Sequence, residues 1–153
     1  MKPRTLADFY NATERLSYHP KEVFFLKRTG LKKLIAFDDR FREVVKILTE
    51  LIDASPQNLK VLDIGVGDAI YESMLPANRR KKCQFHGVDI SPQQIERAKK
   101  YLFEGKVIDI NSDKLPYPKN SFDIIIISEI LEHVFFPDKL LENAEKVLKP
   151  GGF

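Results

Sequence analysis

The chain has 153 residues, which is enough for one domain with a hydrophobic core. Hydrophobic residues make up 43% and charged residues 31%, and a formal net charge of +3 is too small to indicate nucleic-acid binding by itself. Cys83 is the only cysteine, which excludes an internal disulfide, and the N-terminus lacks the apolar core of a signal peptide. No apolar run approaches the length of a membrane span, so we predict a cytoplasmic protein that does not enter a membrane.

The chain divides into two predicted parts. Residues 1–36 mix aromatic and basic residues without a clean period, and we expect an N-terminal helical segment there. Residues 37–153 have the pattern of one α/β domain. It opens with apolar residues at helical spacing, which predict a helix with Asp38 or Asp39 as N-cap that ends near the turn "ASPQN".

Strands and helices then alternate along the chain. Strands are predicted over "LKVLDIG", "CQFHGVDI" beginning at Cys83, "GKVIDI" and "SFDIIIIS". Helices are predicted from about Ala69 to Leu75, over "SPQQIERAKKYL" and over "FPDKLLENAEKVL". In the second helix we expect Ser91 as N-cap, Pro92 in the first turn and Gln94 completing a capping box. The third is expected to bury one face made of Leu140, Leu141, Ala144, Val147 and Leu148.

This alternation predicts a parallel sheet with right-handed crossovers and helices on both faces, a Rossmann-like α/β fold. The closing "KPGGF" has the pattern of a turn that leads into another strand. We therefore expect the fold to be incomplete at the C-terminus, with further strands missing.

The stretch "VLDIGVGDA" indicates a ligand at the end of the first strand, where Gly65 and Gly67 would let the backbone approach it closely. A dinucleotide fingerprint would place a third glycine where this chain has Ile70, and Asp63 would add negative charge beside a pyrophosphate. A ligand carrying positive charge suits this loop better. About 20 residues further on, Asp89 ends the second strand, where an acid accepts hydrogen bonds from ribose hydroxyls, although it could also only cap the next helix.

Four segments in order, "VLDIGVGDA", "GVDIS", "LPYPKNSFDIIIISEILEHV" and "VLKPGGF", resemble the class I S-adenosylmethionine-dependent methyltransferases, in particular the subgroup with LPF…FD…EVLEHV…LKPGG. The resemblance covers roughly residues 59 to 153. It implies S-adenosyl-L-methionine as cofactor and methyl transfer to a small-molecule acceptor. RNA is a second acceptor class, which nothing in the sequence specifically indicates.

The resemblance also implies roles for individual residues. Asp63, Gly65 and Gly67 would hold the methionine part of the cofactor, with Asp63 near its ammonium, and Asp89 would bind the ribose. Ile90 would pack on the adenine, and Asp109 with the backbone of Ile110 would bind the adenine amino group. Asn111 is an alternative to Asp109, which could also be only a turn residue. Ser128 and Glu129 would line the place where cofactor and acceptor meet, and Ala69 replaces a glycine usual in the family.

Two further roles stay open. Glu129, Glu132 and His133 have metal-ligand chemistry and would share one helical side, but a polar packing role explains them as well. By similarity, Tyr10, Arg15 and Tyr18 could form a lid over the cofactor, or they could simply pack. No catalytic base can be assigned.

Two other functions compete with the methyltransferase hypothesis. The chain could be a non-catalytic remnant or a partner subunit with the same fold, which its early end at Phe153 favours. It could also be a nicotinamide-dependent oxidoreductase, against which Ile70 and the "LPYP", "FD" and "KPGG" segments argue.

Overall fold

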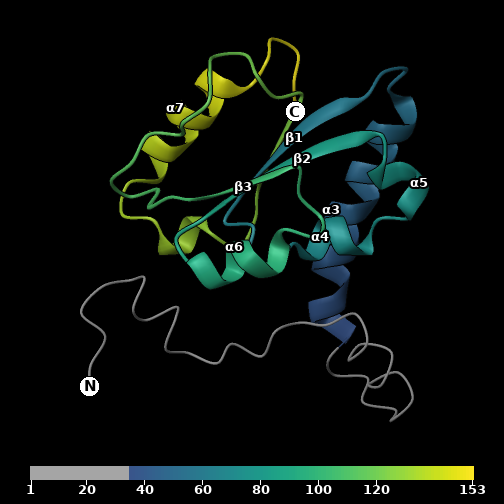
Figure 1. The fold of residues 1–153 in the computed structure, drawn as a ribbon, viewed down its shortest axis with the longest axis horizontal. Helices are drawn as coiled ribbons and strands as arrows, with labels where there is room; N and C mark the ends of the chain where they lie inside the picture. The colour runs from purple at the N-terminus through teal and green to yellow at the C-terminus, as the bar shows by residue number, and fades with distance from the viewer. Residues whose placement is uncertain (1–34) are drawn as a thin grey trace.

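The computed structural model describes residues 35–153 of the chain (Figure 1). Four parallel strands form one sheet: β1 (Leu59–Ile64), β2 (Cys83–Asp89), β3 (Glu104–Val107) and β4 (Ile124–Ile127), in the order β3-β2-β1-β4. The predicted parallel α/β sheet is therefore confirmed. The proposed lid residues Tyr10, Arg15 and Tyr18 lie outside the described residues.

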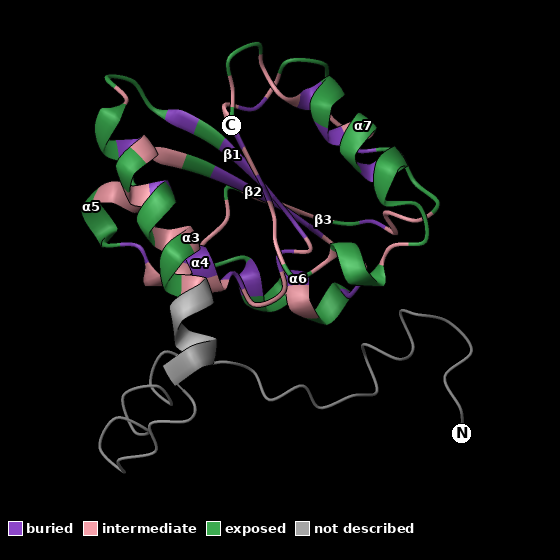
Figure 2. Cartoon of the chain, turned by 180° about the vertical axis from the view of Figure 1, so that it is seen from behind, coloured by how far each residue is buried: buried purple, intermediate pink, exposed green. Residues whose placement is uncertain are grey.

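Helices cover both faces of the sheet (Figures 1 and 2). The helices are α3 (Ile35–Ala54), α4 (Ile70–Met74), α5 (Ala77–Arg80), α6 (Pro92–Ala98), the short 3₁₀ helix η2 (Leu131–His133) and α7 (Pro137–Val147). In both views α3, α4, α5 and α6 lie on one side of the sheet and α7 lies on the other. The predicted arrangement with helices on both faces is confirmed.

The alternation of side chains along β1 divides the core into two layers. Leu59 and Val61 pack with residues of α3 and α4, whereas Leu62 and Ile64 pack with residues of α7. β4 follows the same rule, because Ile124 and Ile126 belong to the first layer. The position of Asp63 in this alternation places it on the face covered by α3 and α4.

Several predicted boundaries were wrong. α3 begins at Ile35, so Asp38 and Asp39 lie inside the helix and neither is its N-cap. α5 was not predicted, because "ANRR" makes only one turn after Pro76. β3 ends at Val107, two residues before a turn that Asp109 stabilises. In α7, Leu141 is exposed, because the buried face of the helix is narrower than expected.

The capping box predicted at the start of α6 is half correct. Ser91 Oγ accepts a hydrogen bond from the Gln94 backbone N–H, and Pro92 takes the first turn. The Gln94 side chain does not complete the box, because the Ser91 N–H donates to Asp89 Oδ1 at 2.8 Å and Gln94 Oε1 has no hydrogen-bond partner.

The C-terminal residue of the chain pairs with β4. The Phe153 N–H donates to the Asp123 carbonyl at 3.0 Å, and the Ile125 N–H donates to the Phe153 carbonyl at 2.8 Å. This alternation of bonds is that of a parallel ladder, so the "KPGG" turn leads into a strand position beside β4, as predicted.

Two further predictions can be compared with the structure. Cys83 begins β2 partly buried, as expected, and burial raises the pKa of its thiol to about 11.

Within residues 35–153, no helix combines the length and the apolar character that crossing a bilayer requires.

Candidate cofactor-binding site

A hollow that is open to solvent lies at the carboxyl ends of the strands. It is lined by Gly65, Gly67, Val88, Asp89, Ile90, Gln94, Ile108, Asp109, Ile110, Asn111, Glu129, Ile130 and His133. In an open parallel sheet this edge is where ligands bind, and the reversal of strand order between β1 and β4 marks the point. Six of the residues predicted to bind a cofactor therefore line one hollow: Gly65, Gly67, Asp89, Ile90, Asp109 and Ile110.

The two glycines after β1 both have a positive φ, but the space beside them differs. Gly65 has φ 80°, and a Cβ there would lie 3.0 Å from the Ile130 side chain. Gly67 has φ 51°, and a Cβ there would meet nothing closer than the Gly65 carbonyl at 4.0 Å. The space above Gly67 is therefore open to a ligand, whereas that at Gly65 is closed by the protein. Ala69, where relatives usually carry glycine, adopts the left-handed φ of 57° that a glycine would adopt without strain.

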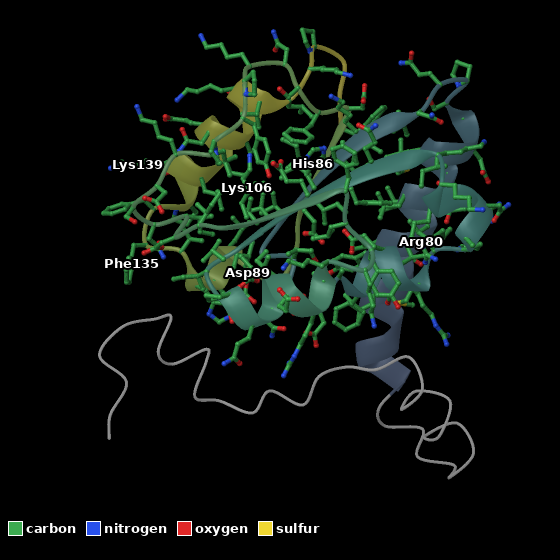
Figure 3. All side chains as sticks on the ribbon, viewed as in Figure 1. Arg80, His86, Asp89, Lys106, Phe135 and Lys139 are labelled. Atoms are coloured by element: carbon green, nitrogen blue, oxygen red, sulfur yellow. The ribbon has the colours of Figure 1, made fainter. Side chains whose placement is uncertain are left out.

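Asp89 connects the glycine loop to the next helix. Its Oδ2 accepts a hydrogen bond from the Gly67 N–H at 3.0 Å, and its Oδ1 accepts one from the Ser91 N–H at 2.8 Å. Figure 3 shows Asp89 at the end of β2, beside α6. The two roles considered for Asp89, capping the next helix and binding a ligand, therefore do not exclude each other. Each carboxylate oxygen can accept a second bond, so the side chain is held in place and can still bind a ligand hydroxyl.

The loop after β3 carries the two candidate adenine-binding residues, and both line the hollow. Asp109 Oδ1 accepts a hydrogen bond from the Asn111 N–H at 3.0 Å, which is the turn role foreseen for it. Asn111 Oδ1 accepts one from the Phe135 N–H at 2.8 Å, which ties this loop to the segment after β4. Both side chains shape the wall of the hollow, and the choice of adenine ligand stays a prediction.

Asp63 does not line the hollow. Its side chain is 2% exposed and lies beside Glu72 of α4, which is fully buried. Burial, followed by the negative charges of Glu72 and Asp89, raises the pKa of Asp63 well above its usual value. Burial also raises the pKa of Glu72 to about 7. Asp63 and Glu72 are buried and do not line the hollow, whereas Gly65, which follows Asp63 by two residues, does, so the two carboxyl groups lie behind the glycine loop.

Ser128 is also set back from the hollow. Its Oγ accepts a hydrogen bond from the Tyr71 hydroxyl at 2.7 Å, which links the end of β4 to α4. Burial raises the pKa of Tyr71 to about 12, although the bond to Ser128 opposes the shift. Glu129, the next residue, does line the hollow and has a left-handed φ of 56°. A non-glycine residue in that conformation at a strand end is a common feature of binding sites.

The candidate metal ligands do not share one helical side. Glu129 precedes η2 with a left-handed backbone, and Glu132 and His133 lie in a single 3₁₀ turn, so the three residues are not carried by one α-helix. Across residues 35–153, no three His, Cys, Asp or Glu side chains lie where they could hold one metal ion together.

Sequence reasoning did not predict four of the residues that line the hollow, Val88, Gln94, Ile108 and Ile130. Ile130 packs over Gly65, and no pattern in the sequence indicates that contact. Glu72 was also missed, although a signal existed, because it is a charged residue in a helix whose neighbours Tyr71 and Leu75 are buried.

A parallel sheet, a glycine loop after β1 and an acid at the end of β2 define a nucleoside-binding protein of the Rossmann-like class. The sequence matches the family described as methyltransferase domain over residues 62–153, and the chain belongs to that family. The resemblance to the S-adenosylmethionine-dependent methyltransferases is thereby confirmed.

Characterised relatives are similar over part of their length. The chain is 30% identical over 152 residues to the mitochondrial ubiquinone biosynthesis O-methyltransferase of Candida albicans, covering 94% of this chain and 43% of that protein. It is 33% identical over 101 residues to the 27-O-demethylrifamycin SV methyltransferase of Amycolatopsis mediterranei, covering 61% and 36%. The chain thus spans less than half the length of these curated relatives.

Solved structures share the fold. An S-adenosylmethionine-dependent methyltransferase from Aquifex aeolicus matches 87% of this chain and 69% of its own, with 23% identity and a TM-score of 0.54. The [4+2]-cyclase SpnF matches 72% of this chain and 42% of its own, with 24% identity and a TM-score of 0.58. At this level of identity the likeness establishes the fold alone, and these two proteins show that the fold carries more than one reaction.

Proposed function

We propose that the chain binds S-adenosyl-L-methionine in the hollow at the carboxyl ends of its strands and acts in methyl transfer to a small molecule. The observation that carries the proposal is the position of Asp89. Its carboxylate lines the hollow while both oxygens are fixed, by the N–H of Gly67 and by that of Ser91. An acid held this firmly at the end of β2 suits a pair of ribose hydroxyls.

The other residues of the hollow fit the rest of the cofactor. The open space above Gly67 admits a ligand against the backbone, and Ile90, Ile108 and Ile110 offer apolar surface for a planar base. The acidic groups behind the glycine loop suit the positive charge of the amino-acid end. The donor set therefore matches an adenosyl group joined to a cationic amino acid.

The bound cofactor supplies a methyl group on a sulfonium, which a nucleophile can displace in line. For such a reaction the protein mainly aligns the two partners and excludes water. Glu129 and Ile130 follow β4 and line the hollow, so we propose that they face the acceptor. The choice of a small-molecule acceptor is supported by the two relatives above, whose names describe methylation of ubiquinone precursors and of a rifamycin.

Calorimetry with S-adenosylhomocysteine tests the binding proposal. We expect Asp89→Ala to weaken binding by about 100-fold or more, because hydrogen bonds to a charged group contribute about 1.5–3 kcal/mol each. Asp138→Ala, which removes an exposed acid in the first turn of α7, is the matched control and should bind like the unaltered protein.

Circular dichroism must first show that Asp89→Ala is folded, since Asp89 also accepts bonds from the backbone; Asp89→Asn is the milder variant. Equal affinity in the unaltered protein and in folded Asp89→Ala would contradict the proposal. Binding of NAD in place of S-adenosylhomocysteine would instead support the oxidoreductase. Binding without transfer to any acceptor would support a non-catalytic module.

A further inference from the structure

Two carboxyl groups face each other behind the glycine loop, Asp63 on β1 and Glu72 on α4; we call them the acid pair. Their side chains are 2% and 0% exposed, and hydrogen bonds are lacking at Asp63 Oδ2 and at both carboxylate oxygens of Glu72. Buried polar atoms are nearly always hydrogen-bonded in folded proteins, so three such atoms together require an explanation.

The charged groups around the acid pair do not neutralise it. From the end of β2, the negative charge of Asp89 raises the pKa of Asp63. From the segment after β4, the negative charge of Glu129 raises the pKa of Tyr71, the residue before Glu72. From α5, Arg80 donates to the backbone carbonyls of Glu72 and Leu75, not to the carboxylate of Glu72.

From residue 41 onward, where the structure describes its side chains, helix α3 does not place a buried cation beside the pair either. Its charged side chains from residue 41 onward, which are Arg42, Glu43, Lys46, Glu50 and Asp53, are exposed. Among the described residues, no cation therefore pairs with the carboxylate of Glu72 or with Asp63 Oδ2.

An acid pair in such a place cannot carry two negative charges. Removing an isolated carboxylate from water is so costly that the group keeps a proton instead. Two carboxyl groups in contact titrate as a unit. Burial raises the pKa of both, and the charge of Glu72 together with a hydrogen bond to it raises the pKa of Asp63 further. A positive charge at this end of the hollow would remove that penalty.

We propose that Glu72 is a second acidic residue of the cofactor's ammonium site, where it acts with Asp63 as a pair that carries one negative charge. This inference rests on the proposed function. Asp63 precedes Gly65 by two residues, so the pair lies directly behind the loop on which the amino-acid end is expected. Glu72 is a positioning residue, because it acts on the ammonium through Asp63.

The proposal has a consequence that a purely structural pair would not have. Below neutral pH the free pair holds two protons, and binding of a ligand with an ammonium group expels one of them to solvent. Above about pH 7.5 the free pair already carries its single charge, and no proton needs to leave. Affinity should therefore rise by up to about tenfold per pH unit from pH 6 to 7 and then level off.

Calorimetry on the full chain with S-adenosylhomocysteine, in buffers of different ionisation enthalpy, measures the proton released. We expect close to one proton at pH 6 and close to none at pH 8. 5′-Methylthioadenosine, which shares the adenosine and the thioether but lacks the amino-acid end, should release none at either pH. In Glu72→Gln the group whose pKa is raised to about 7 is replaced by a neutral amide, so the difference in proton release between pH 6 and pH 8 should disappear.

Each outcome has one meaning. Failure of both ligands to bind would overturn the proposed function. Binding of S-adenosylhomocysteine without proton release at pH 6, or equal release with 5′-methylthioadenosine, would overturn the role of the acid pair and leave cofactor binding intact. If Glu72→Gln does not fold, Glu72→Met, which cannot ionise either, replaces it, and the difference in proton release between pH 6 and pH 8 should again disappear.

Discussion

The two ends of the sheet carry acids whose pKa values are shifted in opposite directions. At the amino ends of β1 and β4, Asp123 Oδ2 accepts a hydrogen bond from the Lys60 N–H at 2.8 Å and Oδ1 accepts one from Lys149 Nζ at 2.7 Å. Burial tends to raise the pKa of Asp123, but the hydrogen bonds to Lys149 and Lys60 outweigh it and hold the pKa below its usual value. At the carboxyl ends, Asp63 and Glu72 have raised pKa values.

The difference follows from what each end does. Asp123 joins three segments, namely the start of β1, the start of β4 and the "KPGG" turn, so its pairing stabilises the fold. No cation or N–H donor is bonded to Asp63 Oδ2 or to the Glu72 carboxylate among the described residues. A negative charge on the acid pair therefore lowers the free energy of unfolding of the protein without ligand. A fold usually carries such a conflict at a functional site, where a ligand resolves it. Substitutions at the two ends should therefore change stability in opposite directions.

The largest expected effect is at Glu72. Glu72→Gln should raise the free energy of unfolding at pH 8 by on the order of 3 kcal/mol, because it replaces a buried group whose pKa is raised to about 7 by a neutral one. Urea denaturation without ligand measures it. Glu50→Gln, the same change at an exposed position of α3, is the control and should be nearly neutral.

The sign of the pH dependence is a second part of this test. The folded pKa of Glu72 lies above its unfolded value, so its contribution to stability is greatest at low pH and is lost as the pH rises toward about 7. The advantage of Glu72→Gln should accordingly shrink between pH 7 and pH 5. A destabilised variant at pH 8, or an advantage that does not change with pH, would show that Glu72 is satisfied in the free protein.

The next effect should have the opposite sign. Asp123→Asn should lower the free energy of unfolding by about 1–2 kcal/mol, because it weakens hydrogen bonds to a charged group at the start of β1 and β4. Since the folded pKa of Asp123 is lowered, its contribution is present above its unfolded pKa and is lost as the pH falls through the folded value. Denaturation at pH 7 and at pH 2.5 should show the difference disappearing; an equal loss at both would point to altered packing.

This contrast also shows what the sequence could predict. The alternation of strands with helices and the positions of Gly65, Gly67 and Asp89 follow from local patterns, because a strand end, a glycine pair and a fixed spacing are visible along the chain. The role of Asp63 was assigned by resemblance. Glu72 could not be found that way, because its contact with Asp63 depends on how α4 packs on β1, which is a tertiary property.

The errors have the same origin. The capping box at α6 was predicted from Ser91 and Gln94, but the Ser91 N–H pairs with Asp89, which belongs to the preceding strand. That Ser128 lines the ligand site stays a prediction, but the bond its hydroxyl accepts from Tyr71 of α4 could likewise not be foreseen from its own segment. In each case the sequence indicated the correct segment, and a side chain from another element decided the contact.

The smallest effect concerns the hydrogen bond that the Tyr71 hydroxyl of α4 donates to Ser128 at the end of β4. Tyr71→Phe and Ser128→Ala should each lower the free energy of unfolding by about 1 kcal/mol, the usual contribution of a neutral hydrogen bond. The double variant should cost scarcely more than either single one, since both remove the same interaction. Additive losses in this double-mutant cycle would mean that the two hydroxyls act separately, and that Ser128 is available to the hollow after all.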